Sequence, residues 1–93
     1  MNDTEVLDAV SKARRAYKSA VTRANNRYKA AAHAAFEFYG STDVEQTARA
    51  NVIQRADAAR WVTRSAAEMA LRVKLAEIKA RAGMWADLVS EAL

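Results

Sequence analysis

The stretch Phe36-Glu-Phe-Tyr-Gly-Ser-Thr-Asp-Val-Glu45 decides the fold, because one long helical pattern ends there and a second one begins. Gly40 is the only glycine before residue 83, and the chain contains no proline. Glycine adopts at low cost the left-handed conformation that closes many helices. Thr42 and Glu45 have the spacing of a capping box, in which each side chain binds a free backbone amide at a helix start. We therefore expect a helical hairpin that turns at residues 40–42.

The segment before this turn carries one regular apolar line with steps of three and four residues. That period is typical of one face of a helix, and it predicts a helix over about residues 3–39. Asp3 or Thr4 is expected to cap its start. The line consists of Val6, Val10, Ala13, Tyr17, Val21, Ala24, Tyr28, Ala31, Ala35 and Phe38.

The segment after the turn predicts a second helix, over about residues 43–82, with two apolar lines. The first line consists of Val62, Ala66, Met69, Val73, Ala76 and Ala80. The second line consists of Leu71, Leu75, Ile78, Ala82, Trp85 and Val89. At about 100° per residue the two lines lie on nearly opposite faces. One antiparallel neighbour covers only one face, so the face with the larger residues is expected to meet a second copy, the folded-back C-terminus or another protein.

Gly83 leaves two interpretations open for the C-terminal segment 84–93. It either ends the second helix, so that a short third helix folds back, or it is a tolerated glycine within a continuous helix. The second apolar line crosses Gly83 in phase, which favours continuity. The predicted fold is an all-α antiparallel hairpin, a single domain over residues 1–93, assembled into a dimeric helical bundle.

Length and composition limit the class of protein. Much of the 52% hydrophobic share of the 93 residues is alanine, so the chain has few large side chains with which to bury a core. The absence of cysteine excludes disulfides and thiolate chemistry. No apolar run approaches the roughly 20 residues of a membrane span, and the N-terminus lacks the pattern of a signal peptide. We expect a cytoplasmic protein that does not contact a membrane.

The distribution of charge is more informative than the net charge of +4. Residues 12–29 contain seven basic residues and no acidic one, and the hairpin places residues 53–70 opposite them. Such a surface attracts nucleic acid or an acidic protein, although a solvated polar face has the same composition. Trp61 lies among arginines, and tryptophan and arginine often dominate binding energy. We call the following set the basic belt: Lys12, Arg14, Arg15, Lys18, Arg23, Arg27, Lys29, Arg60, Trp61 and Arg64.

Catalytic signatures are missing from the sequence. It has no glycine-rich phosphate loop, no carboxylates at a converging spacing and no nucleophile beside a base. His33 is the only histidine, and Glu37 is its only obvious carboxylate neighbour. We therefore expect no catalytic, metal or cofactor site, and no small-molecule substrate.

These patterns predict a non-enzymatic interaction protein that forms a homodimer and binds a negatively charged partner through the basic belt. The partner is expected to be an acidic protein or nucleic-acid-binding machinery, as for phage-encoded inhibitors of host complexes, with direct nonspecific nucleic-acid binding as an alternative. The second apolar line is the predicted oligomer or partner interface: Leu71, Leu75, Ile78, Ala82, Trp85 and Val89.

A further alternative comes from the bend. Two helices of about 40 residues joined at Phe38-Tyr39-Gly40 resemble the WXG100 secreted helical hairpins, with Phe38 at the position of that family's tryptophan. The resemblance implies a secreted helical hairpin. A structural assembly protein that forms larger oligomers is the remaining alternative.

Overall fold

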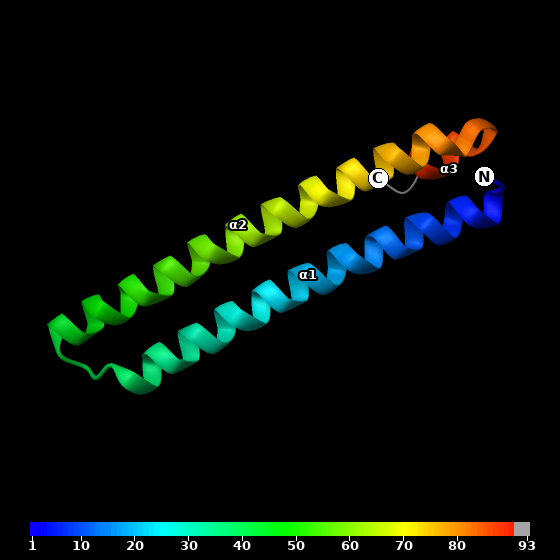
Figure 1. Ribbon diagram of the computed structural model, residues 1–93. Helices are drawn as coiled ribbons and strands as arrows, with labels where there is room; N and C mark the ends of the chain where they lie inside the picture. Colours follow the sequence, from blue (N-terminus) through cyan, green and yellow to red (C-terminus); the bar gives the residue numbers. More distant parts are fainter. Residues whose placement is uncertain (91–93) are drawn as a thin grey trace. The chain divides into compact units, whose positions relative to one another are not determined.

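The computed structural model describes residues 1–90, and these are helical apart from the chain start and the turn, with no strand among them. Helix α1 spans Asp3–Phe38 and helix α2 spans Asp43–Ala82. A short 3-10 turn, Gly83–Trp85, leads into α3, Ala86–Ser90 (Figure 1). The predicted all-α helical hairpin is thereby confirmed. Residues 91–93 of the predicted C-terminal segment lie outside the described residues.

The chain divides into two compact units. The terminal unit contains Met1–Ser19 and Ala66–Leu93, and the turn unit contains Ala20–Ser65. Both long helices contribute to both units, so each unit pairs a segment of α1 with an antiparallel segment of α2.

The turn unit is closed by the capping box that the sequence predicts. The Glu45 amide donates to the Thr42 hydroxyl at 3.2 Å, and that hydroxyl donates to the Glu45 carboxylate at 2.7 Å. The same carboxylate also accepts the Gly40 amide at 2.7 Å. The cap therefore secures both the end of the turn and the start of α2.

Gly40 serves a different purpose from the predicted one. The backbone angle φ of Gly40 is not positive; among residues 1–90, only Gly83 has a positive φ. A Cβ atom on Gly40 would lie 2.7 Å from a Glu45 carboxylate oxygen. Glycine is favoured here because the cap approaches the backbone closely, and the left-handed conformation predicted for Gly40 is wrong.

Helix α1 begins at Asp3, as predicted, but its N-cap is Asn2, one residue before Asp3 and two before Thr4, the two predicted caps. The Asn2 side-chain oxygen accepts the Glu5 amide at 2.8 Å, and the Asn2 carbonyl accepts the Val6 amide at 3.1 Å. Asn2 is therefore the N-cap, while Asp3 binds only the neighbouring Thr4 amide. Asp3 and Glu5 still lie in the first turn, where the helix dipole favours carboxylates.

The apolar line of α1 is the buried face of that helix, as predicted. Val6, Val10, Ala24 and Ala35 are buried, and the other members are half-buried, apart from Phe38. Phe38 is 80% exposed because α1 ends at this residue and no helix covers it.

The core of the terminal unit contains the second apolar line of α2. Leu75, Ile78 and Ala82 are buried in one cluster with Val6 and Val10 of α1. Val89 of α3 completes the cluster, and Leu71 and Trp85 pack against it while half-buried. In Figure 1 the start of α1 (blue) lies beside the end of α2 and α3 (orange to red). Helix α1 and the folded-back α3, which is one of the three occupants that the sequence analysis allowed, thus cover the face whose six residues were assigned to an oligomer or partner interface.

The C-terminal segment folds back, and the preference for one continuous helix is wrong. Helix α2 ends at Ala82, and Gly83 has a φ of 61°. Lys79 and Arg81 occupy the last turn of α2, where positively charged side chains stabilise the helix by interacting with its unpaired backbone carbonyl groups. The left-handed glycine redirects the chain so that Val89 returns to the core. Trp85 and Val89 continue the apolar spacing of α2 across Gly83, but they reach the cluster from the folded-back segment.

Candidate interaction site

A shallow groove of about 210 Å³ lies between α1 and α2 within the turn unit. Alanines form much of its lining, and the basic side chains Arg27 and Arg60 flank it. No carboxylate lines it. The complete lining is Ala24, Arg27, Tyr28 and Ala31 from α1 with Ala56, Ala59, Arg60 and Thr63 from α2.

Arg60 is held in place by contacts with both helices. Its guanidinium carbon lies 4.0 Å from the ring centroid of Tyr28, a cation–π contact between α2 and α1. It also pairs with Asp57, one turn earlier on α2. The Arg60 Nε atom is buried and has no hydrogen-bond partner. The groove therefore has a fixed cationic wall, in contrast to the freely solvated lysines of α1.

Trp61 and Arg64 lie on another side of α2. At about 100° per residue, Asp57, Trp61 and Arg64 share one side of the helix, whereas Ala56 and Ala59 of the groove share another. Trp61 is 60% exposed, and the Arg64 guanidinium carbon lies 5.6 Å from its ring centroid. Trp61 therefore projects from the helix surface, but away from the groove.

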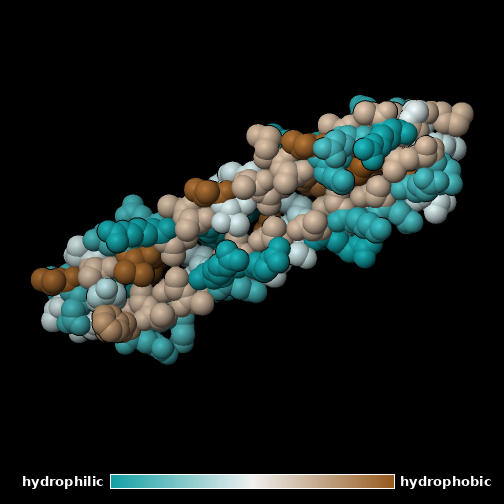
Figure 2. All heavy atoms as spheres, in the orientation of Figure 1, coloured by the Kyte–Doolittle hydropathy of each residue, from teal (hydrophilic) through white to brown (hydrophobic). Residues whose placement is uncertain are grey.

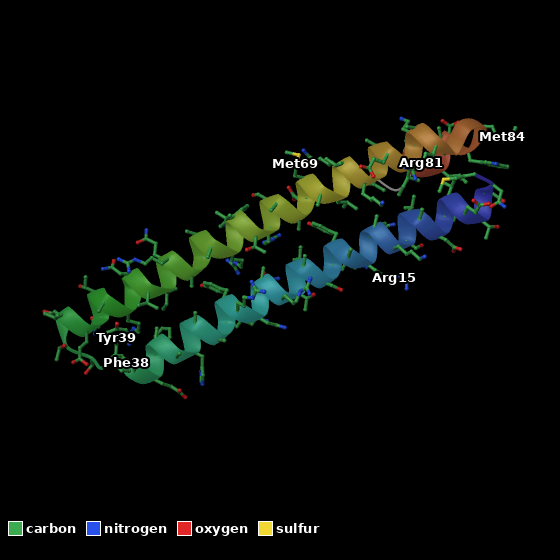
Figure 3. All side chains as sticks on the ribbon, in the orientation of Figure 1. Arg15, Phe38, Tyr39, Met69, Arg81 and Met84 are labelled. Atoms are coloured by element: carbon green, nitrogen blue, oxygen red, sulfur yellow. The ribbon has the colours of Figure 1, made fainter. Side chains whose placement is uncertain are left out.

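The basic belt is not one continuous patch. All seven of its members on α1 are exposed, and Figure 3 shows Arg15 pointing away from α2. Arg27 lines the groove, whereas Lys29 lies about 200° around α1 from it. Lys12, Arg14, Arg15 and Lys18 belong to the terminal unit. Within the turn unit, the structure brings together Arg27 and Arg60, with Arg23 one turn from Arg27.

The predicted oligomer interface is not an open surface. Leu75, Ile78, Ala82 and Val89 are buried within the chain, and Leu71 and Trp85 are half-buried against them. Large aliphatic side chains stabilise a fold more when buried than alanines do, because they remove more apolar area from water. The larger of the two apolar lines therefore became the core, which corrects the assignment of these six residues to a partner.

The other apolar line of α2 is exposed instead. Met69 and Val73 are 61% and 51% exposed, and the alanines of the line before and after them are exposed as well. Figure 3 shows Met69 on the side of α2 that faces away from α1. We call the five residues of this line within the terminal unit the α2 seam: Ala66, Met69, Val73, Ala76 and Ala80.

The turn end of the turn unit carries exposed aromatic and acidic residues. Phe38 and Tyr39 meet edge to face, with ring centroids 5.0 Å apart, and the Arg49 guanidinium carbon lies 4.4 Å from the Phe36 ring centroid. Figure 2 shows strongly hydrophobic side chains at the surface of this end.

The Thr42 hydroxyl and the Gly40 amide hold the pKa of Glu45 below its ordinary value. Apart from Asp57, the acids of this unit, Glu37, Asp43 and Glu45, all lie near the turn, away from the groove.

The single histidine is a surface residue. His33 Nε2 lies 3.0 Å from the Glu37 carboxylate, and both side chains are exposed. Among residues 1–90 no three histidines or carboxylates lie close enough together to hold a metal ion. In the same part of the chain, no helix combines the length and the apolar character needed to span a membrane.

The sequence did not single out Tyr28 as a site residue. It appears there only as one member of the apolar line of α1, and its partner Arg60 lies 32 positions away on the other helix.

Comparisons of the chain with protein-family models, with curated proteins and with solved structures find no match.

Proposed function

We propose that this chain is a non-enzymatic interaction protein that binds an acidic segment of another protein in the groove between Arg27 and Arg60. The observation that carries the proposal is the composition of that groove, which combines an alanine floor with two arginines and no carboxylate. An apolar side chain of the partner would occupy the floor. Neighbouring carboxylates of the partner would pair with the guanidinium groups.

The electrostatics of the turn unit support the same partner. Arg23 and Arg27 are exposed on consecutive turns of α1, so both side chains are accessible to a partner. The nearest acid on α2, Asp57, is already paired with Arg60. An approaching carboxylate therefore meets positive groups and no competing negative side chain in the lining.

Matched charge reversals test this proposal. Arg27→Glu and Lys29→Glu change the net charge equally and alter exposed side chains of the same helix, but only Arg27 lines the groove. Binding is measured by fluorescence anisotropy with a labelled 12-residue peptide of alternating glutamate and leucine. We expect Arg27→Glu to weaken binding by about tenfold or more, equivalent to about 1.4 kcal/mol, and Lys29→Glu to weaken it less than threefold. Equal losses, or no binding by the unaltered chain, would overturn the groove as the site.

Nucleic-acid binding is the second candidate, because exposed Trp61 beside Arg64 can stack on a base. A labelled 20-nucleotide single strand and a 20-base-pair duplex serve as probes in the same assay. Tighter binding of either one than of the acidic peptide, with an affinity that falls steeply with salt and is lost in Trp61→Ala, would favour this candidate.

A further inference from the structure

The α2 seam has the repeat of a coiled-coil surface. Its steps from Ala66 to Ala80 are three, four, three and four, which places Ala66, Val73 and Ala80 at a positions and Met69 and Ala76 at d positions. Leu71, Leu75 and Ile78 then fall at the f and c positions, on the face already buried against α1. The repeat thus describes a second packing face of the same helix.

The seam holds more than a stripe of small residues. Met69 and Val73 occupy its centre, and both are more than half exposed. The three alanines at its other positions let a neighbouring helix approach closely, to about 8 Å between axes. Exposed methionine and valine side chains of this kind stabilise a helix pair when they become buried.

The charges beside the seam identify its occupant. Arg72 lies at a g position and Glu77 at the following e position, and both are exposed. In a parallel pair of α2 helices, a g residue faces the e residue five positions further along the partner helix. Arg72 of each copy would then face Glu77 of the other, so one symmetric arrangement forms two ion pairs.

An antiparallel pair of the same helices lacks this complementarity. There g faces g and e faces e, so Arg72 and Lys79 would face basic residues of the other copy. Two further positions flank the seam, Ser65 at g and Ala70 at e. Both are small and uncharged, so they disfavour neither the parallel nor the antiparallel pair. Within residues 1–90, Glu77 forms one ion pair, with Lys74 at 3.7 Å; both side chains are exposed, so this pair is easily exchanged.

We propose that the α2 seam binds a second copy of this chain, in a parallel, in-register homodimer fixed by Arg72–Glu77 pairs. This proposal does not depend on the groove, because the seam residues lie in the terminal unit and the groove lies in the turn unit. Failure of one leaves the other standing. Helix α3 remains folded on its own chain in the dimer.

Cysteine cross-linking tests the arrangement, because the chain has no native cysteine. In a parallel in-register dimer every d residue lies beside its own copy. Met69→Cys and Ala76→Cys should therefore each give a disulfide-linked dimer under mild oxidation. In an antiparallel pair at most one of them can, since the two positions are about 10 Å apart along the helix and a disulfide needs Cα atoms within about 7 Å. Arg81→Cys, exposed at a b position, is the control that should stay monomeric.

Charge exchange tests the pairing without cross-links. By sedimentation equilibrium, Arg72→Glu and Glu77→Arg should each weaken dimerisation by about tenfold, and the double variant should restore it to within about threefold. Cross-linking at only one of the two d positions would overturn the parallel arrangement. A native chain that stays monomeric up to millimolar concentration would overturn the second copy as the occupant, and would leave the seam to a different protein.

Discussion

Val6 and Val89 stand 83 residues apart in sequence, yet both lie in one core cluster, where they are the two most completely buried large side chains. Val6 is the fourth residue of α1 and Val89 comes from α3, and Leu75, Ile78 and Ala82 of α2 complete their surroundings. The two ends of the described chain therefore stabilise each other.

Val6→Ala should destabilise the chain by about 2 kcal/mol, because it removes two methyl groups from a site with no exposed surface. Leu7→Ala is the matched control. Leu7 is 49% exposed, so its truncation should cost less than about 0.5 kcal/mol. Urea unfolding followed by circular dichroism measures both. Equal effects of the two variants would show that Val6 is not a core residue.

Gly83→Ala distinguishes the folded-back C-terminus from a continuous helix by the sign of its effect. At a φ of 61° alanine should cost about 1–2 kcal/mol, entirely from the backbone, since nothing lies within 4 Å of an added Cβ. In a continuous helix the same change would stabilise the chain by about 1 kcal/mol. Gly83→Asn is the control and should cost less, because asparagine tolerates the left-handed region. The measurement is again urea unfolding.

The sequence predicted the existence and bounds of the two long helices because these depend on local signals. The capping box of Thr42 and Glu45 and the period of the apolar line on α1 both act within a few residues. The same local signals could not predict which face of α2 packs against α1, since its two apolar lines have the same period. Side-chain size was the available signal: leucine and isoleucine bury more area than alanine, and the face that contains them became the core.

The candidate site could be predicted only in part. Local composition identified Arg27, Arg60 and Arg64 as exposed or surface-lining cations. Local composition could not predict that Arg27 and Arg60 line the groove while Arg64 lies on another side of α2, because the groove forms only when α1 and α2 pack together. The Tyr28–Arg60 contact is likewise a tertiary relationship between residues on separate helices.

Arg60 and Tyr28 should be energetically coupled by about 1 kcal/mol, the strength of a partly desolvated cation–π contact. A double-mutant cycle with Arg60→Met and Tyr28→Leu measures this coupling from unfolding free energies. Arg55→Met replaces the first change in the control cycle, because Arg55 is exposed on the same helix. Coupling of the same size in the control cycle would contradict the specific contact.

The turn should respond to pH through Glu45. Its pKa is lower in the folded chain than in the unfolded one, so the ionised carboxylate stabilises the turn. That stabilisation is complete above the unfolded pKa of about 4.3 and is lost as the pH falls through the lower folded value. NMR titration of the Glu45 carboxyl carbon and the Gly40 amide proton should give the same depressed midpoint.

Glu45→Gln is the control for this titration. The Gly40 amide should then show no transition in that pH range, because the carboxylate that accepts its hydrogen bond is gone. A Glu45 midpoint at or above about 4.3 in the native chain would mean that the cap does not form in solution.

The return of α3 to the core helps α1 to bury the Leu71–Val89 face, so the corrected assignment of that face rests on it. Methyl NOE spectra, recorded on a sample dilute enough to be monomeric, test it most directly. We predict cross-peaks between the Val89 methyl groups and those of Leu75 or Ile78, together with a cross-peak to Val6 or Val10 of α1. Val89 contacts confined to residues within four positions along the chain, as in one straight helix, would contradict the account.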